Sequence, residues 1–225
     1  MTALITSYNK GVLTMPDFIT VNEQSSIRIA AEKTIYFDPL HISGEPHDAD
    51  IVFITHDHYD HFSPEDIAKV AKTDTRFVAP SSLEKSFAKA GIGEGMTTFM
   101  HPAYSAEVEG VPIDAVAAYN LIKPFHPRKN GWLGYVVTVM GKRVYVCGDT
   151  DITNEARAVK CDIICVPVGG TFTMNAKQAA DLVNIIKPDI AIPIHYGTMA
   201  GKPSDGDTFA AAVEKSVKVE KKLSF

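Results

Sequence analysis

Three histidines and two aspartates lie within six consecutive residues of this chain, in the run His-Asp-His-Tyr-Asp-His at 56–61. In an extended segment, residues two apart point to the same side, so His56 and His58 can hold one metal ion together. Asp60 and His61 point differently and can serve a second ion nearby. Imidazole and carboxylate are ligands that zinc, manganese and iron sites use. Because buried polar groups without partners are costly, the run predicts a metal site rather than core packing; the alternative is an exposed polar turn.

Two further residues of ligand type come directly after apolar, strand-like runs. Asp149 follows the run 143–147, and His195 follows the run 189–194, just as His56 follows 51–54. Three predicted strands therefore each deliver a candidate ligand at a carboxyl end. Active sites of layered α/β proteins commonly lie at this edge, because its loops are not needed for core packing.

The elements that must position these residues alternate along the chain. Strands are predicted at 27–31, 34–37, 51–54, 76–80, 113–119, 133–140, 143–147, 162–168, 189–194 and 217–223. A helix should begin after Ser63, where Ser-Pro-Glu-Asp supplies an N-cap, a proline at the first helical position and an acid three residues on. Further helices are expected from 81 to near 91, from 175 through 187, and about 207–215. No linker divides the chain, so we expect a single domain over 1–225 with sheets inside and helices outside.

Composition narrows the function classes. The 225 residues are 45% hydrophobic and 22% charged, as in ordinary globular proteins. The net charge of −5 argues against nucleic acid as a partner, because phosphate-tracking proteins are usually basic. A small anionic substrate held beside metal ions stays compatible with this charge.

Location is also constrained by composition. No apolar run reaches the roughly 18 residues that cross a membrane, and the first residues do not form a secretion signal. The three cysteines, Cys147, Cys161 and Cys165, show no disulfide-framework spacing. We expect a cytoplasmic protein with reduced thiols.

In order and spacing, these motifs resemble the metallo-β-lactamase-fold hydrolases across nearly the whole chain. The resemblance implies an α/β fold, a four-layer αβ/βα sandwich in which two mixed β-sheets face each other and helices flank them. It also implies a role for each matching residue. His56 and His58 would bind the first ion, Asp60, His61 and His195 the second, Asp149 would bridge the two, and Asp38 would support the site without binding metal.

Finer features resemble one branch of that family. Gly-Gly-Thr-Phe-Thr-Met at 169–174, followed by a predicted helix and then His-Tyr-Gly-Thr at 195–198, is similar to the L-ascorbate-6-phosphate lactonase-like branch. That branch includes many hydrolases of unassigned substrate.

One position departs from the family pattern. The family usually offers a third histidine to the first ion, yet this chain carries Asn120 there, with His126 six residues further on. Either His126 completes the first site, or Asn120 coordinates weakly through its carbonyl, or one ion dominates. We favour His126, and predict one of its ring nitrogens about 2.0–2.3 Å from a bound metal. His41, His47 and His101 are interpreted as surface residues.

The expected function is that of a metal-dependent hydrolase. A bound ion lowers the pKa of its water from near 16 to about 7, and the resulting metal-bound hydroxide would attack a small ester, lactone or phosphodiester. Asp60 and Asp149 would orient the hydroxide, and Tyr196, or His126 if it is not a ligand, would donate to the oxyanion or leaving group. Zinc is the favoured metal, with manganese and iron as alternatives, at one or two ions per chain.

Other interpretations stay open at this point. Lys123, Arg128 and Lys129 could read an anionic group on a small-molecule substrate, or could form a solvated basic loop. A homo-oligomer is compatible with the sequence. The protein could hold metal without turnover. A diiron oxidoreductase is disfavoured, because that group typically has glutamate where this chain has His58.

Overall fold

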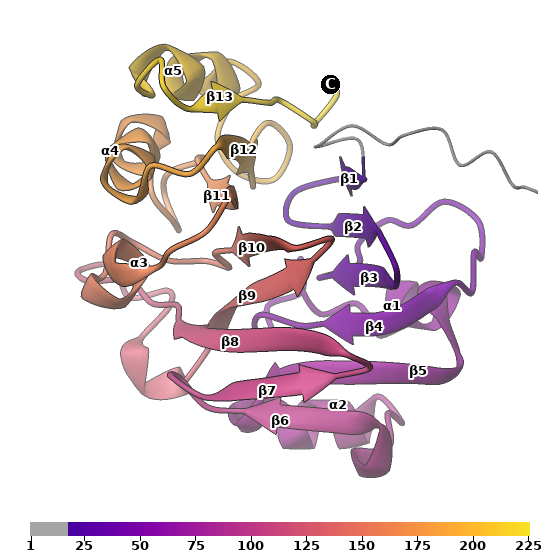
Figure 1. The fold of residues 1–225 in the computed structure, drawn as a ribbon. Coiled ribbons are helices and arrows are strands. Elements are labelled where there is room, and N and C mark those ends of the chain that lie inside the picture. Colours follow the sequence, from indigo (N-terminus) through magenta and orange to yellow (C-terminus); the bar gives the residue numbers. More distant parts are fainter. Residues whose placement is uncertain (1–17) are drawn as a thin grey trace, which may run out of the picture.

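The computed structural model describes residues 18–225, whose strands form two mixed sheets that lie face to face (Figure 1). The first sheet has the order β1-β2-β3-β4-β5-β6, and the second has the order β13-β12-β11-β10-β9-β8-β7. The first-sheet strands are β1 (Ile19–Val21), β2 (Ile27–Ala30), β3 (Thr34–Phe37), β4 (Ala49–Phe53), β5 (Ala71–Pro80) and β6 (Thr97–Met100). The second-sheet strands are β7 (Ser105–Val108), β8 (Val111–Ala117), β9 (Leu133–Val139), β10 (Lys142–Val146), β11 (Ile163–Pro167), β12 (Ile190–Ile194) and β13 (Lys218–Val219).

The helices lie on the two outer faces (Figure 1). They are α1 (Pro64–Val70), α2 (Glu84–Lys89), α3 (Asn154–Ala158), α4 (Ala176–Ile186) and α5 (Asp205–Ala212), with short 3-10 turns η1 (Ser81–Leu83), η2 (Glu94–Met96) and η3 (Arg128–Asn130). Buried Ile67 of α1 and Phe87 of α2 pack on the first sheet. Leu182 of α4 and Phe209 of α5 belong to the apolar cluster that covers the second sheet.

A third apolar cluster fills the space between the sheets and completes the four layers. Phe37 and Phe53 stack there with ring centroids 4.6 Å apart, and Tyr135 of the opposite sheet meets Phe53 edge-on at 5.1 Å. The Tyr135 hydroxyl donates to the Ile54 carbonyl across the gap at 2.9 Å. The αβ/βα sandwich predicted from the sequence is therefore confirmed.

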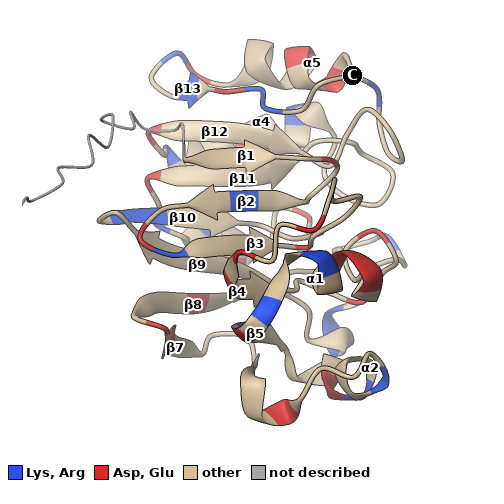
Figure 2. Cartoon of the chain, turned by 90° about the vertical axis from the view of Figure 1, so that its right-hand side faces the viewer, with Lys and Arg blue, Asp and Glu red and all other residues tan. Residues whose placement is uncertain are grey.

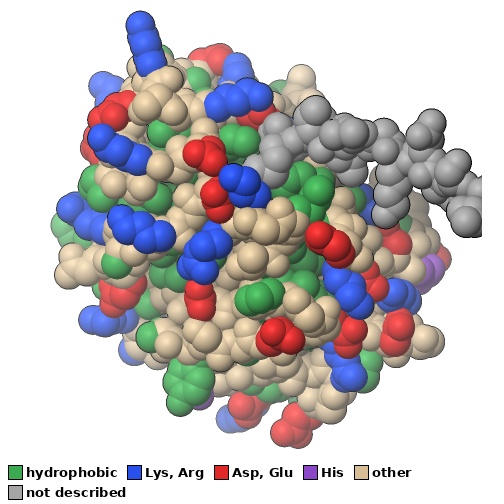
Figure 3. All heavy atoms as spheres, viewed as in Figure 1, with side chains coloured by type: hydrophobic (Ala, Val, Ile, Leu, Met, Phe, Trp, Pro, Cys, Tyr) green, Lys and Arg blue, Asp and Glu red, His purple; other side chains and the backbone are tan. Residues whose placement is uncertain are grey.

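The inner strands read as uninterrupted apolar runs because both of their faces are covered. Strands β11 and β12 are buried at every position, and Figure 2 colours both strands tan, as uncharged residues. They pair in parallel with each other, and β11 also pairs in parallel with β10. On the face shown in Figure 3, acidic and basic side chains are interspersed, with no continuous basic track.

Local signals fixed the helix starts as predicted. The Ser63 hydroxyl accepts from the Asp66 backbone N–H, with Pro64 in the first turn of α1. Asn175 and Gln178 form a reciprocal capping box at the start of α4. No helix among residues 18–225 is long and apolar enough to cross a membrane.

Several boundaries differ from the sequence-based prediction. Strands β1, β6 and β7 and helix α3 were not predicted, because each is short and its stability comes from its neighbours rather than from its own pattern. Strand β5 begins already at Ala71, and α5 spans Asp205–Ala212 instead of 207–215. The last strand keeps only Lys218–Val219 of the predicted 217–223, at the edge of the sheet where it pairs on one side with β12.

Candidate metal centre

Four loops at the carboxyl ends of strands bring the candidate ligands together. The loop after β4 carries residues 56–61, the segment after β8 carries His126, the turn after β10 carries Asp149, and β12 ends at His195. The four strands come from both sheets, so the site lies where the two sheets open at one end of the sandwich. His56, His61, His126, Asp149 and His195 are all buried.

The first ligand group consists of three imidazoles, those of His56, His58 and His126. One nitrogen of each lies within 4.8 Å of the others. His56 Nε2 and His58 Nδ1 are 3.1 Å apart, a separation that a shared proton or a shared metal ion can bridge. The Trp132 indole packs behind them, with its centroid 4.9 Å from the His56 ring and 4.8 Å from the His58 ring. This apolar wall fixes the ring planes of the group.

A second ligand group lies beside the first and consists of Asp60, His61 and His195. Asp60 Oδ2 is 3.6 Å from His61 Nε2 and 3.4 Å from His195 Nε2. The group therefore offers two imidazoles and one carboxylate, a mixture that zinc, manganese and iron sites use.

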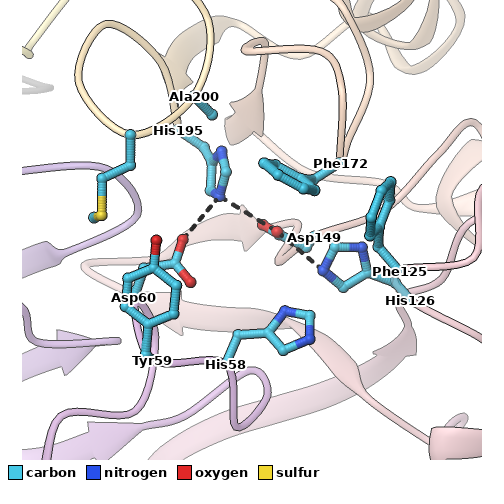
Figure 4. A pocket seen from close by; sticks show the side chains of 10 residues that line it. His58, Tyr59, Asp60, Phe125, His126, Asp149, Phe172, His195 and Ala200 are labelled. Carbon is cyan, nitrogen blue, oxygen red and sulfur yellow. Dashed lines mark ion pairs between the residues drawn. The ribbon is translucent and has the colours of Figure 1, made fainter.

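The Asp149 carboxylate lies between the two groups (Figure 4). Its Oδ2 atom is 3.2 Å from His126 Nε2 and 3.3 Å from His195 Nε2. Its Oδ1 atom is 3.4 Å from His61 Nε2. One carboxylate thus faces ligands of both groups, which is the position of a bridging ligand.

Unpartnered buried atoms show that this chemistry fits a metal. Four buried atoms have no hydrogen-bond partner among residues 18–225: His61 Nε2, His126 Nε2, His195 Nε2 and Asp149 Oδ1. Buried polar groups rarely lack a partner, because the desolvation cost is large. Two ligands of one tetrahedral zinc ion, at bonds of about 2.1 Å, lie about 3.4 Å apart. The observed 3.2–3.4 Å separations around Asp149 match that spacing.

Hydrogen bonds from Asp38 and Thr55 set the tautomers of His56 and His61, the two buried histidines of the loop after β4. Asp38 Oδ2 accepts from His61 Nδ1 at 2.7 Å and from the Thr55 hydroxyl at 2.6 Å. Its Oδ1 atom accepts from the Thr55 backbone N–H at 2.8 Å. Thr55 Oγ1 also lies 3.0 Å from His56 Nδ1, and accepts its proton. Both histidines are therefore protonated at Nδ1, which leaves each Nε2 lone pair free for a metal.

Asn120 sets the tautomer and orientation of the His126 ring in the same way. Its Oδ1 atom accepts from the His126 backbone N–H at 3.1 Å and from His126 Nδ1 at 3.0 Å, while its Nδ2 donates to the Phe172 carbonyl at 2.9 Å. Both polar atoms of the Asn120 side-chain amide are thus engaged, the oxygen by His126 and the nitrogen by the Phe172 carbonyl. The structure brings His126 into the first group, and Asn120 orients it.

Electrostatics divide the ligands into two kinds. Burial lowers the pKa of His56, and the neighbouring His61 lowers it further, so His56 is neutral. Burial also lowers the pKa of His195, but Asp149 and Asp60 outweigh it and raise that pKa to about 10. Burial raises the pKa of Asp149, but His195 and His61 outweigh it and hold it well below the usual range. A cation at this place, proton or metal, compensates the buried carboxylates.

Tyr196 is the predicted site residue that the structure keeps away from the cluster. Its ring is buried within the apolar cluster around α4 and α5, and its hydroxyl lies against Gly206, where an added Cβ would come within 2.5 Å of it. A donor role toward substrate is therefore corrected: the helix α5 backbone occupies the direction in which the hydroxyl points.

The basic residues of the 121–130 segment are largely engaged elsewhere. Lys123 Nζ donates to Asp151 Oδ1 and to the Thr173 carbonyl, both at 2.6 Å. Arg128 pairs with Glu155 at 2.7 Å. His41, His47 and His101 lie on the surface, outside the ligand groups.

Sequence reasoning did not single out Thr55 or Phe172 as contributors to the site. The only signal for Thr55 was its place between an apolar strand and His56. Phe172 belonged to a motif quoted for resemblance, and the fold alone reveals that its ring lines the metal-facing cavity and its carbonyl holds Asn120.

Known proteins share this arrangement of chain and fold. The family model described as "Beta-lactamase superfamily domain" matches residues 19–195. A UPF0173 metal-dependent hydrolase of Thermococcus onnurineus is 29% identical over 209 residues, which cover 87% of this chain and 91% of that protein. Another, of Thermoplasma acidophilum, is 32% identical over 167 residues, 72% of either chain. A solved structure of a candidate metal-dependent hydrolase of Parabacteroides distasonis has a TM-score of 0.76 and 30% identity, over 92% of this chain and 93% of that one.

Proposed function

The chain belongs to the β-lactamase superfamily, among its UPF0173 metal-dependent hydrolases, and from this premise we propose that it cleaves a small ester, lactone or phosphodiester with the help of two metal ions. One observation carries the proposal. Unpartnered buried nitrogen and oxygen atoms converge at the spacing of metal ligands, and Asp149 lies between the two groups.

Each residue of the two ligand groups has a proposed role in binding metal or moving a proton. His56, His58 and His126 would hold the first ion, and Asp60, His61 and His195 the second, with Asp149 shared between them. Ions held there lower the pKa of bound water toward neutrality and polarise the bond under attack. Asp60 lines the cavity, so its carboxylate would accept the proton of the attacking water and return it to the leaving group. We assign both proton steps to Asp60 because a carboxylate can hold an ion through one oxygen and take a proton on the other. Both ring nitrogens of His126 are already engaged, by Asn120 and toward Asp149, and Tyr196 is turned away.

We propose zinc as the resident metal. The two groups together with Asp149 supply five imidazoles and two carboxylates, a ligand set that zinc accepts readily, and that manganese or iron would also accept. Cys147, Cys161 and Cys165 are free thiols outside these groups, which supports a reducing, cytoplasmic location.

The finer substrate class rests on two sequence motifs. The motifs at 169–174 and 195–198 keep a lactone, as in the L-ascorbate-6-phosphate lactonase-like branch, among the candidates. We further propose that 1–225 act as one hydrolase domain on a small molecule, since every ligand loop belongs to the same two-sheet sandwich. A homo-oligomer stays compatible with this proposal.

The test compares metal-stripped and metal-reloaded protein on phenyl acetate, δ-valerolactone and bis(p-nitrophenyl) phosphate. Zinc reloading should restore hydrolysis of at least one of the three. The double variant His56→Ala/His58→Ala should lose most of one ion by elemental analysis and at least about 100-fold in turnover. The matched double variant His41→Ala/His47→Ala, at two exposed histidines, should keep its metal content and its turnover. Two firmly bound ions with no turnover on any substrate would instead favour a metal-holding protein, and full metal content in the first variant would refute the ligand assignment.

A further inference from the structure

The space in front of the ligand groups is a cavity of about 230 Å³ with a polar floor and apolar walls (Figure 4). Candidate ligands make the floor. Tyr59, Phe125, Phe172, Met199 and Ala200 line the rest. The Phe125 and Phe172 rings meet edge to face, with centroids 4.8 Å apart at 78°, so they support each other as one wall.

Positive side chains do not reach this cavity. Among the described residues, no lysine or arginine lines it. The nearest sequence candidate, Lys123, is tied to Asp151 and to the Thr173 carbonyl, and Arg128 is tied to Glu155. A phosphate or carboxylate carried by the substrate away from its reacting bond would therefore lose water without gaining a cation. Desolvation of an ionic group without a partner is unfavourable, so such substrates are selected against.

We infer that this cavity selects substrates whose group next to the scissile bond is uncharged and apolar, an aryl or short alkyl group that packs against Phe125 and Phe172. The inference rests on the proposed hydrolytic function and specifies its substrate class. A dry cavity of about 150 Å³ accommodates benzene. The 230 Å³ here has room for a ring together with the reacting group.

Hydroxamate probes test the metal centre and the apolar selectivity of the cavity separately, because the hydroxamate group binds metal ions whatever its substituent. The probes are acetohydroxamate, phenylacetohydroxamate and sulfoacetohydroxamate, whose sulfonate is anionic but coordinates metals poorly. Their Kd values for zinc-loaded protein are measured by calorimetry. Phenylacetohydroxamate should bind about 10- to 100-fold more tightly than acetohydroxamate, as expected for burying one ring. Sulfoacetohydroxamate should bind no more tightly than acetohydroxamate.

Two variants locate the effect on the wall. Phe172→Ala should reduce the phenyl gain, the ratio of the acetohydroxamate Kd to the phenylacetohydroxamate Kd, to less than about threefold, and Met199→Ala should reduce this ratio partly. Phe99→Ala is the matched control, because Phe99 is also half-buried and meets another ring, Phe87, at 5.6 Å, but it does not line this cavity. The control should keep the full difference in Kd between acetohydroxamate and phenylacetohydroxamate.

The outcomes are distinguishable. If acetohydroxamate itself does not bind the loaded protein, the metal centre of the proposed function is refuted, and the inference falls with it. If acetohydroxamate binds but the phenyl group adds less than about threefold, or the sulfonate adds as much as the phenyl group, the metal centre stands and the apolar selection is overturned.

Discussion

Replacing Asp38 by asparagine tests whether the outer hydrogen bonds set the metal-binding tautomer of His61. Asp38 is fully buried, and its carboxylate only accepts hydrogen bonds: from Thr55 N–H at 2.8 Å, from the Thr55 hydroxyl at 2.6 Å and from His61 Nδ1 at 2.7 Å. The asparagine side chain has nearly the same shape, but one of its two polar atoms is a donor. The substitution therefore changes chemistry and not volume.

Neither orientation of the new amide satisfies all three donors. With the amide nitrogen in place of Oδ2, His61 Nδ1 has to accept a hydrogen bond, and its proton moves to Nε2, which faces Asp149 Oδ1 at 3.4 Å. A protonated Nε2 cannot bind a metal ion. With the amide turned over, its nitrogen instead meets the Thr55 backbone N–H, and two buried donors face each other.

Both the ion affinity and the stability should respond, by different amounts. Loss of an outer partner of a metal-bound histidine typically weakens metal binding about 10- to 100-fold, and we expect the larger value because the wrong tautomer is favoured. One unsatisfied buried donor costs about 1–3 kcal/mol in the free energy of unfolding, partly offset because a buried charge is removed. The metal-free variant should therefore fold, but bind its second ion poorly.

Zinc affinity is measured by competition with a chromogenic chelator, and stability by urea unfolding of the metal-free protein. Asp66→Asn is the matched control: Asp66 is also buried and accepts from His41 N–H, Ile42 N–H and the Ser63 hydroxyl, away from the ligand groups. The control should lose comparable stability and keep wild-type zinc affinity. An Asp38→Asn protein that binds two zinc ions with wild-type affinity would refute the tautomer argument.

Three other perturbations address the ligands directly. Asp149→Ala should lower turnover by at least about 100-fold with a small change in thermal midpoint, because its carboxylate contacts imidazoles rather than core side chains; equal losses in both would indicate a structural role. Asn120→Leu removes the acceptor for both N–H groups of His126, so zinc binding should weaken about 10- to 100-fold, and unchanged affinity would show that another contact orients this ring. In the metal-free protein His195 has a pKa of about 10, raised above the roughly 6.5 of the unfolded chain. The stability this gives is complete below pH 6.5 and declines as the pH rises toward 10, whereas zinc-loaded protein should not show that decline, because the ion replaces the proton. Urea unfolding between pH 6 and 10, with and without zinc, measures the difference, and parallel curves would contradict it.

Much of the centre could be predicted because its signals are local in the chain. A period of two along an extended segment places His56 and His58 on one side, whatever the rest of the protein does. Apolar runs long enough for buried strands precede Asp149 and His195, and the carboxyl ends of such strands are open edges. Helix caps at Ser63 and Asn175 likewise depend on neighbours within a turn. These features follow from sequence because short-range geometry alone creates them.

Short elements and side-chain directions depended on distant partners instead. Strand β1 has three residues and is held by antiparallel pairing with β2. Three residues are too few for their own pattern to predict this pairing. The aromatic ring of Tyr196 follows a metal-ligand histidine in sequence, yet α5 closes over its hydroxyl. Adjacent residues of an extended segment point in opposite directions, so the position of Tyr196 next to His195 did not place its hydroxyl in the pocket.

The choice between Asn120 and His126 was decided by the tertiary structure. The sequence offered both as candidates for the first ligand group, since both follow the same predicted strand, and left open that one ion dominates. Which one faces the ligands depends on the course of the segment between them, and contacts from far along the chain fix that course. The Phe172 carbonyl holds the Asn120 amide, and Asp151 holds Lys123. With its amide engaged in this way, Asn120 orients the His126 ring, whose Nε2 atom faces Asp149.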